Sequence, residues 1–265
     1  MTHSLFEIPW KGSVLRGILV QPDQISTRVC VCVPGFEGSA STAKKYTALS
    51  TELARNGIAS LRLDFIGCGL SGGSYADMTV ADLAMQLHAV YSHVRTTFPD
   101  ISYVGHSLGA CVIVKQLQLE PVTESPRLGF LSPALNQKEL LRYLYVRERA
   151  KIVGSKPVEW GTYRENLNEQ EFLHYCHTAR ETKYTIMQSG YFLENSEMDY
   201  RTFLPKDMRN ILFVCGDHDQ VVPTASFQTS DMKILTVAGG DHENEKPSLL
   251  EQWLPAMVAH LCRTV

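Results

Sequence analysis

Short runs of apolar, largely β-branched residues alternate along this chain with longer segments whose apolar residues recur at helical spacing. The short runs predict strands at Val14–Val20, Arg28–Val33, Ile58–Asp64, Ile101–Gly105, Arg127–Leu131, Ile211–Gly216 and Lys233–Val237. The helical pattern predicts helices at Thr42–Asn56, capped by Ser41 or Thr42, and at Thr79–Thr97, Leu108–Leu119 and Pro247–Cys262. Strands that are apolar throughout are buried on both faces. We therefore expect an α/β protein with a mostly parallel central sheet and helices on both faces.

One long stretch interrupts this alternation. Between Pro133 and Leu204 no clear buried strand is visible, and the chain looks helical only in pieces, at Gln137–Arg149 and Asn168–Arg180. Connections of this length without structure of their own are uncommon in compact domains. We expect residues 1–133 and 205–265 to form the core and residues 134–204 to form a helical lid inserted over one edge of the sheet. Two ordinary crossover helices with long loops are the alternative.

Composition excludes several function classes. The 265 residues are 44% hydrophobic and 20% charged, which is typical of a globular protein with one large core. The net charge of −3 provides no basic field for nucleic acid, and no run approaches the ~18 apolar residues of a membrane span. Four of seven cysteines (Cys30, Cys32, Cys111 and Cys215) lie in apolar runs, which indicates buried thiols in a reducing compartment. Because no signal peptide is visible, we expect a cytoplasmic protein; its oligomeric state stays open.

The strongest chemical signal is Gly105-His106-Ser107-Leu108-Gly109, which follows a predicted strand and opens a predicted helix. Gly-x-Ser-x-Gly in this context is typical of a nucleophile elbow. The sharp turn would hold the Ser107 hydroxyl above the sheet edge, at a helix N-terminus that favours negative charge. The alternative is a serine that only caps a helix after a glycine turn.

A serine hydroxyl needs a base, and this elbow requires an acid and then a histidine further along the chain. Asp219 follows the strand ending at Gly216, and His242 follows the strand ending at Val237. We predict Ser107 as nucleophile, His242 as general base and acid, and Asp219 as the group that orients His242. Asp217 and Asp241 are the competing acids, and we expect the side chain of His106 to point away from the Ser107 hydroxyl.

The oxyanion of acyl transfer needs two hydrogen-bond donors. One is expected to be the backbone N–H of Leu108, directly after the nucleophile. The other is expected from Phe36, in the glycine-rich loop Val33–Ser39 that follows an early strand. A plain glycine-rich turn is the alternative for this loop.

These motifs resemble the α/β-hydrolase superfamily, and within it the serine hydrolases similar to monoacylglycerol lipase and to cinnamoyl (feruloyl) esterases. Asp64–Ser71 is similar to the family's Asp-x-x-Gly-x-Gly-x-Ser loop, which supports the oxyanion loop, and Gly216–Pro223 to its acid motif. Family members commonly carry His-Gly where this chain has Pro34-Gly35. The resemblance implies the α/β-hydrolase fold and an enzyme without cofactor or metal.

The sequence thus predicts hydrolysis of a small-molecule carboxylic ester or thioester through an acyl-enzyme on Ser107. An acyltransferase and a carbon–carbon bond hydrolase would use the same triad, and a ligand receptor would keep the fold without turnover. For most polar and aromatic residues of segment 134–204 we favour a packing role. An anionic substrate group held by a basic side chain there is the sharper hypothesis, with Arg142, Arg147, Arg149, Lys151 and Arg164 as candidates.

Overall fold

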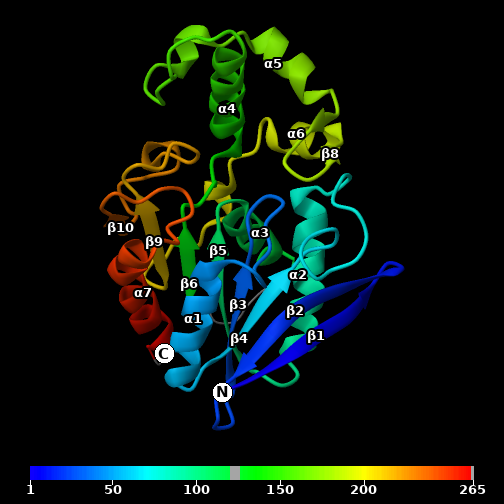
Figure 1. Ribbon diagram of the computed structural model, residues 1–265, viewed down its shortest axis with the longest axis vertical. Helices are drawn as coiled ribbons and strands as arrows, with labels where there is room; N and C mark the ends of the chain where they lie inside the picture. Colours follow the sequence, from blue (N-terminus) through cyan, green and yellow to red (C-terminus); the bar gives the residue numbers. More distant parts are fainter. Residues whose placement is uncertain (120–125, 264–265) are drawn as a thin grey trace.

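A twisted eight-stranded sheet forms the centre of the computed structural model, which describes residues 1–119 and 126–263 (Figure 1). In sheet order the strands are β1 (Thr2–Trp10), β2 (Ser13–Gln21), β4 (Ala59–Asp64), β3 (Arg28–Val33), β5 (Asp100–His106), β6 (Leu128–Leu131), β9 (Ile211–Gly216) and β10 (Ile234–Val237). Pairing is antiparallel between β1 and β2 and between β2 and β4, and parallel from β4 to β10. The mostly parallel sheet predicted from the sequence is therefore confirmed.

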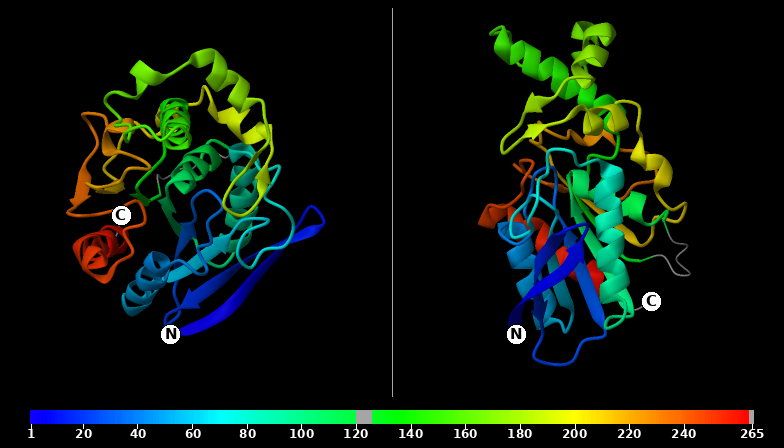
Figure 2. Two further views of the ribbon diagram at one scale, coloured as in Figure 1. Left: turned by 45° about the horizontal axis from the view of Figure 1, so that its top comes forward. Right: turned by 90° about the vertical axis from the view of Figure 1, so that its right-hand side faces the viewer.

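Helices cover both faces of the sheet (Figure 2). α1 (Lys44–Arg55) and α7 (Pro247–Cys262) pack together on one face, and α2 (Val80–Val94) and α3 (Leu108–Gln116) on the other. The period-two alternation of β3 divides its side chains between the two cores. Val29, Val31 and Val33 join the core under α2 and α3, whereas Cys30 and Cys32 join the core under α1 and α7. The four cysteines expected to be buried thiols are buried and unpaired.

The structure differs from the sequence analysis in one missed strand and one helix start. The sequence did not predict β1, because only Phe6 and Ile8 are buried in this edge strand and its apolar pattern is correspondingly weak. α1 begins two residues later than expected, with Ala43 at its N-cap and no capping side chain. The hydroxyl of Thr42, one of the two expected caps, instead contacts the hydroxyl of Ser39 at 3.0 Å.

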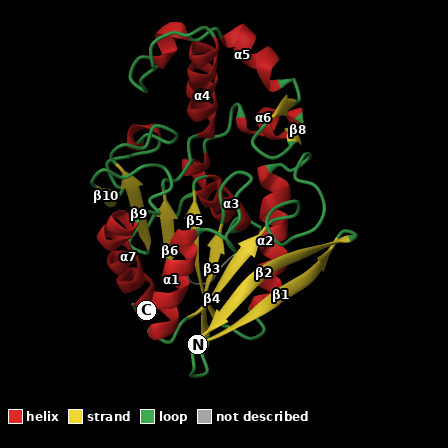
Figure 3. Ribbon diagram, in the orientation of Figure 1, coloured by secondary structure: helices red, strands yellow, loops and turns green. Residues whose placement is uncertain are grey.

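The segment between β6 and β9 contains more structure than the sequence predicted. Its elements are α4 (Gln137–Ile152), a 3₁₀ turn (Tyr163–Asn166), α5 (Glu169–Cys176), the two-stranded hairpin of β7 (Arg180–Glu181) and β8 (Ile186–Met187), α6 (Ser189–Asn195) and a second 3₁₀ turn (Tyr200–Phe203). Figure 3 shows α4, α5, α6 and the β7–β8 hairpin beyond the carboxyl ends of the parallel strands, at the end of the molecule opposite both termini, whereas the second 3₁₀ turn packs against α3. They cover the sheet edge at which catalytic residues were predicted.

The expected core boundaries include residues 120–125 and 264–265, which lie outside the part of the chain that the structure describes. Within the described part, no helix is long and apolar enough to cross a bilayer.

Candidate active site

Ser107 occupies a sharp turn between β5 and α3 and has backbone angles of φ +52° and ψ −118°. Positive φ is costly for a residue with a side chain and persists only where surrounding contacts hold it. Two backbone hydrogen bonds do so here: Ser107 N–H donates to Leu131 at 2.9 Å, and the Ser107 carbonyl accepts from Ala134 N–H at 3.1 Å. The predicted elbow geometry is therefore present.

The two glycines of the elbow are required by close backbone contacts. A Cβ on Gly109 would lie 2.4 Å from the carbonyl oxygen of Val33, and one on Gly105 would lie 2.8 Å from the carbonyl carbon of Gly109. Real Cβ contacts are essentially never this short. The elbow thus packs directly against the end of β3, which places Ser107 beside the loop that follows Val33.

His242 and Asp219 meet on the loops after β10 and β9. His242 Nδ1 lies 2.8 Å from Asp219 Oδ2, and Asp219 Oδ1 accepts the backbone N–H groups of Val221 and Val222, both at 2.9 Å. The Asp219 side chain is fully buried, whereas that of His242 is 14% exposed. A carboxylate fixed in this way orients the imidazole and leaves Nε2 available for proton transfer.

The competing acids lie elsewhere. Asp217 is exposed at the end of β9. Asp241 directs a carboxylate oxygen to the backbone N–H of Asn244 at 2.8 Å, and Lys246 lies 3.6 Å from its other oxygen. Of the three aspartates that the sequence offered, Asp219 is the one that the structure joins to the His242 ring.

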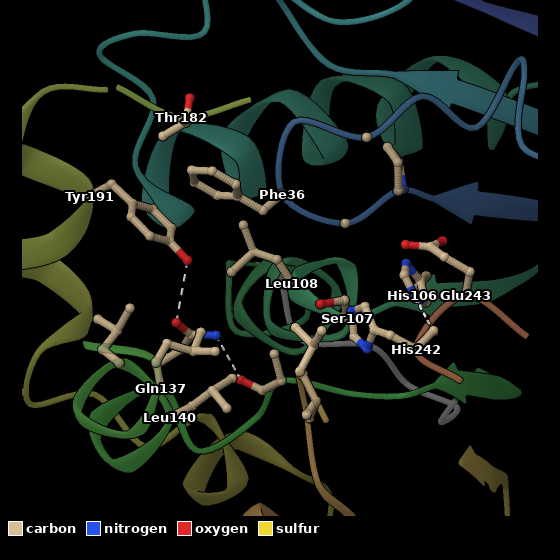
Figure 4. Close-up of a pocket in the computed structure, with 18 of the residues that line it drawn as sticks. Phe36, His106, Ser107, Leu108, Gln137, Leu140, Thr182, Tyr191, His242 and Glu243 are labelled. Atoms are coloured by element: carbon tan, nitrogen blue, oxygen red, sulfur yellow. Dashed lines mark hydrogen bonds between the residues drawn. The ribbon is translucent and has the colours of Figure 1, made fainter. Parts of the chain in front are cut away.

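Ser107, His242, Phe36 and Leu108 all line one cavity of about 470 Å³ between the sheet edge and the inserted segment. Figure 4 shows Ser107 and His242 at one end, with Gln137 and Tyr191 across the cavity from them. These four sequence-predicted residues, drawn from the elbow and two separate loops, therefore share one solvent-accessible space.

The oxyanion loop is held by interactions on both sides. A hydrogen bond from Gly38 N–H to the Gly35 carbonyl, 3.0 Å long, closes the turn that carries Phe36. The buried Asp64 carboxylate accepts the N–H of Ser41 at 3.1 Å and that of Leu70 at 2.9 Å, which joins the loop at 64–71 to the segment after the oxyanion loop. Leu108 is the first residue of α3, where backbone N–H groups have no acceptor within the helix.

His106 has a role that the sequence analysis missed. Its Nε2 lies 2.9 Å from the backbone carbonyl of His242, and the two rings are 4.7 Å apart between centroids. Burial is the main reason why the pKa of His106 is held well below its usual value, and the nearby Lys45 cation acts in the same direction. A neutral imidazole that donates from Nε2 thus supports the loop carrying His242. Only the position of His106 inside the elbow could have suggested this contact.

Lys45 supports the same loop from α1. Its side chain is 3% exposed, and its ammonium group pairs with Glu243 and lies 3.4 Å from Glu245. The sequence carried no signal for this long-range pair. Donor atoms of His106, His242 and Glu243 lie within 4.8 Å of one another. Each side chain already has a partner: His106 contacts the backbone carbonyl of His242, the His242 ring contacts Asp219, and Glu243 contacts Lys45. This donor set therefore serves the loop rather than offering free metal ligands.

The five basic residues suggested for anion binding do not line the cavity. Arg142 is buried and pairs with Glu169 and Glu197, Arg149 with Glu171, and Arg164 with Glu139. Arg147 donates to the backbone carbonyl of Gln220, and Lys151 is exposed. The hypothesis therefore named the wrong basic residues. The partners of the four arginines lie on segments distant in sequence, so the sequence alone could not show that these side chains are paired. Arg180, which it did not name, does line the cavity.

Comparisons with known proteins agree with the fold. A family model described as serine aminopeptidase, S33, matches residues 26–233. The structure of Est1E from Butyrivibrio proteoclasticus with ferulic acid bound is 23% identical, with a TM-score of 0.72, and the match covers 96% of both chains. An esterase from Pyrococcus furiosus is 18% identical (TM-score 0.65, covering 98% of this chain and 90% of that one). A serine hydrolase homologue from Coxiella burnetii is 20% identical (TM-score 0.61, 98% of both chains). No curated protein matches the sequence significantly.

Proposed function

This chain belongs to the serine aminopeptidase S33 family of α/β hydrolases, and from that membership we propose that it cleaves a carboxylic ester or thioester through an acyl-enzyme on Ser107. The observation that carries the proposal is the shared cavity, in which a strained serine lies with a histidine that a buried carboxylate orients. This combination of groups activates a hydroxyl that is otherwise a poor nucleophile.

The proposed mechanism assigns one step to each group. His242 Nε2 takes the proton of Ser107 as the hydroxyl oxygen attacks the substrate carbonyl, and Asp219 stabilises the imidazolium that forms. The backbone N–H groups of Phe36 and Leu108 stabilise the oxyanion. His242 then protonates the leaving alcohol or thiol. In the second half-reaction His242 activates water, which attacks the acyl-enzyme and releases the acid.

The lining of the cavity supports an acyl substrate rather than a strongly polar one. Leu140, Leu141 and Leu144 of α4 form an apolar wall, and Tyr191 of α6 faces the oxyanion loop, with its ring 4.9 Å from that of Phe36. A mostly apolar cavity with a few polar groups is typical of a small-molecule site. We propose that residues 134–204 act as the lid that supplies this wall.

Fluorophosphonate labelling combined with an ester panel tests the proposal. The wild-type protein is expected to be labelled at Ser107 and to hydrolyse p-nitrophenyl esters and acyl thioesters. Ser107→Ala should abolish labelling and lower kcat by roughly 10⁴-fold or more. Ser230→Ala, which changes an exposed serine far from the elbow in sequence, is the matched control. Unchanged ester turnover by Ser107→Ala would refute the mechanism.

The same assays separate the remaining alternatives. Transfer of the acyl group to an added alcohol or amine in preference to water would identify an acyltransferase. Cleavage of a β-diketone without ester turnover would identify a carbon–carbon bond hydrolase. A folded protein that binds ligand but resists fluorophosphonate would be a receptor. Each of these results would replace ester hydrolysis as the assigned function.

A further inference from the structure

One face of α4 forms a wall of the cavity along most of the helix. Gln137, Leu141, Leu144 and Glu148 recur at helical spacing and all line the cavity. Glu148 lies eleven positions after Gln137, so at a rise of 1.5 Å per residue this wall is about 16 Å long. The cavity is therefore elongated, with an apolar middle and polar groups at both ends.

The Gln137 end of this wall is linked to the nucleophile elbow through Ala134. Ala134 N–H donates to the Ser107 carbonyl at 3.1 Å, and the Gln137 side chain donates to the Ala134 carbonyl at 2.8 Å. From there α4 runs away from the sheet (Figure 1). Glu148 thus marks the far end of the cavity, where Tyr175 of α5 and Arg180 of β7 also contribute to the lining.

Arg180 is held there between two aromatic rings. Its guanidinium carbon lies 3.2 Å from the ring centroid of Tyr175 and 3.6 Å from that of Phe192. Its Nη2 group donates to the backbone carbonyl of Tyr175. Stacking of this kind stabilises a cation and fixes its plane. Because rings cover both faces of the guanidinium group, an incoming acceptor can approach only at its edge.

The remaining donors of Arg180 lack acceptors. Nε and Nη1 are shielded from solvent, and neither has a hydrogen-bond partner among the described residues. The described residues also place no carboxylate within ion-pair distance of Arg180. Arg142, Arg149 and Arg164 of the same segment, by contrast, each pair with a glutamate. A shielded cation with unpaired N–H groups is costly, and a ligand acceptor at its edge would remove that cost.

Glu148, the nearby carboxylate, does not remove this excess of donors, because it accepts the hydroxyl of Tyr175. Burial lowers the pKa of Arg180 below its usual value, and the negative charge of Glu148 opposes this shift only in part. Arginine stays protonated at any ordinary pH. The Glu148 end of the cavity wall therefore holds a positive group whose Nε and Nη1 donors have no partner among the described residues.

We propose that Arg180 binds a carboxylate at the distal end of the acyl chain, so that the substrates are esters or thioesters of acids that carry a second, terminal acid group. This inference rests on the proposed hydrolase function. The reactive carbonyl lies at Ser107, the apolar chain lies along Leu140, Leu141 and Leu144, and the distal carboxylate reaches the edge of the guanidinium group.

Carbon-matched ester pairs test the proposal. The mono-p-nitrophenyl esters of adipic, sebacic and dodecanedioic acid are compared with the p-nitrophenyl esters of hexanoic, decanoic and dodecanoic acid. In the wild-type protein kcat/KM should favour the acid-terminated ester for the two long chains but not for the short one, which cannot span the cavity. Arg180→Met should lower this preference by roughly 10- to 100-fold, the effect of losing a hydrogen bond to a charged group. The loss should appear mainly in KM.

Matched variants separate recognition from a structural role. Arg149→Met removes an exposed arginine of α4 that does not line the cavity, and its preference should equal that of the wild-type protein. Glu148→Gln removes the competing negative charge and should increase the preference. Because each preference is a ratio measured within one variant, partial loss of folded protein cancels.

Two outcomes overturn the proposal without touching the proposed function. The first is a wild-type protein that hydrolyses these esters but shows no preference for the acid-terminated ones. The second is an Arg180→Met variant that keeps the full preference. Failure to hydrolyse any ester in the series, together with absent labelling at Ser107, would instead refute the hydrolase function itself, and the inference with it.

Discussion

Asp219 Oδ2 and His242 Nδ1 lie 2.8 Å apart, and two backbone N–H groups bind the other oxygen of the same carboxylate. The backbone thus fixes the Asp219 carboxylate independently of its contact with His242. Asp217, two residues earlier, is exposed and has the same charge. The pair Asp217 and Asp219 therefore provides a matched test of which carboxylate serves catalysis.

Asp219→Asn should lower kcat for ester hydrolysis by roughly 10⁴-fold, because an amide would favour the wrong tautomer of His242. Asp217→Asn should leave kcat within a few-fold of the wild-type value, as is expected of an exposed surface side chain. Steady-state kinetics on a p-nitrophenyl ester, with circular dichroism to verify folding, measures both. A large loss in the Asp217 variant with none in the Asp219 variant would reverse the assignment.

Gly109→Ala should destabilise the protein by about 1–3 kcal/mol. The added Cβ would lie only 2.4 Å from the carbonyl oxygen of Val33, so the two atoms would overlap. The same displacement should move the elbow and reduce esterase activity. Gly161→Ala is the control, since nothing lies within 4 Å of the added Cβ and the change is expected to alter stability by less than about 0.5 kcal/mol. Urea unfolding measures both, and equal stabilities would argue against the packing of the elbow on β3.

His106 should make the protein lose stability in acid. Burial holds its folded-state pKa well below 6.5, whereas in the unfolded chain the pKa returns to about 6.5. Below pH 6.5 the unfolded state therefore binds a proton that the folded state does not. Stability falls as the pH decreases through this window, by at most about 1.4 kcal/mol per pH unit from this one group.

His106→Gln removes this titration and retains a side-chain donor for the His242 carbonyl. The variant should show a shallower loss of unfolding free energy between pH 6.5 and 5 than the wild-type protein. His177→Gln, which changes an exposed histidine, should leave the slope unchanged. The pKa of His260 is also lowered by burial, so some slope remains in every variant. Identical slopes for His106→Gln and wild type would contradict the prediction.

Asp64→Asn should lower stability by about 1–3 kcal/mol. The carboxylate accepts the N–H groups of Ser41 and Leu70 and the hydroxyl of Ser41, and an amide nitrogen would place a donor against at least one of these donors. Since these bonds hold the oxyanion loop, kcat should fall as well. Asp207→Asn changes only an exposed carboxylate that pairs with the side chain and backbone N–H of Arg209, and it should leave stability nearly unchanged. Thermal unfolding and ester kinetics on both variants check this, and an Asp64 variant as stable as the Asp207 variant would be contrary evidence.

Local sequence patterns were sufficient for seven of the eight sheet strands, for the elbow and for the order of the candidate residues. β3 and α7 begin and end where the apolar patterns predict, because continuous burial and a helical repeat are both visible in a single segment. Gly105 and Gly109 mark the elbow, since a turn this tight tolerates no side chain there. Asp219 was also identifiable, although Asp217 competed with it until the burial of each was seen.

Contacts between distant segments could be decided only by the tertiary structure. No local pattern indicates that His106 meets the His242 carbonyl, that Lys45 pairs with Glu243, or that Arg142 is neutralised from two sides whereas Arg180 is not. The periodicity of a sequence reports whether a residue faces the core or solvent. Which charge meets which depends on how the chain brings remote loops together, and that is why the candidate nucleophile was visible in the sequence while the arginine proposed to select its substrate was not.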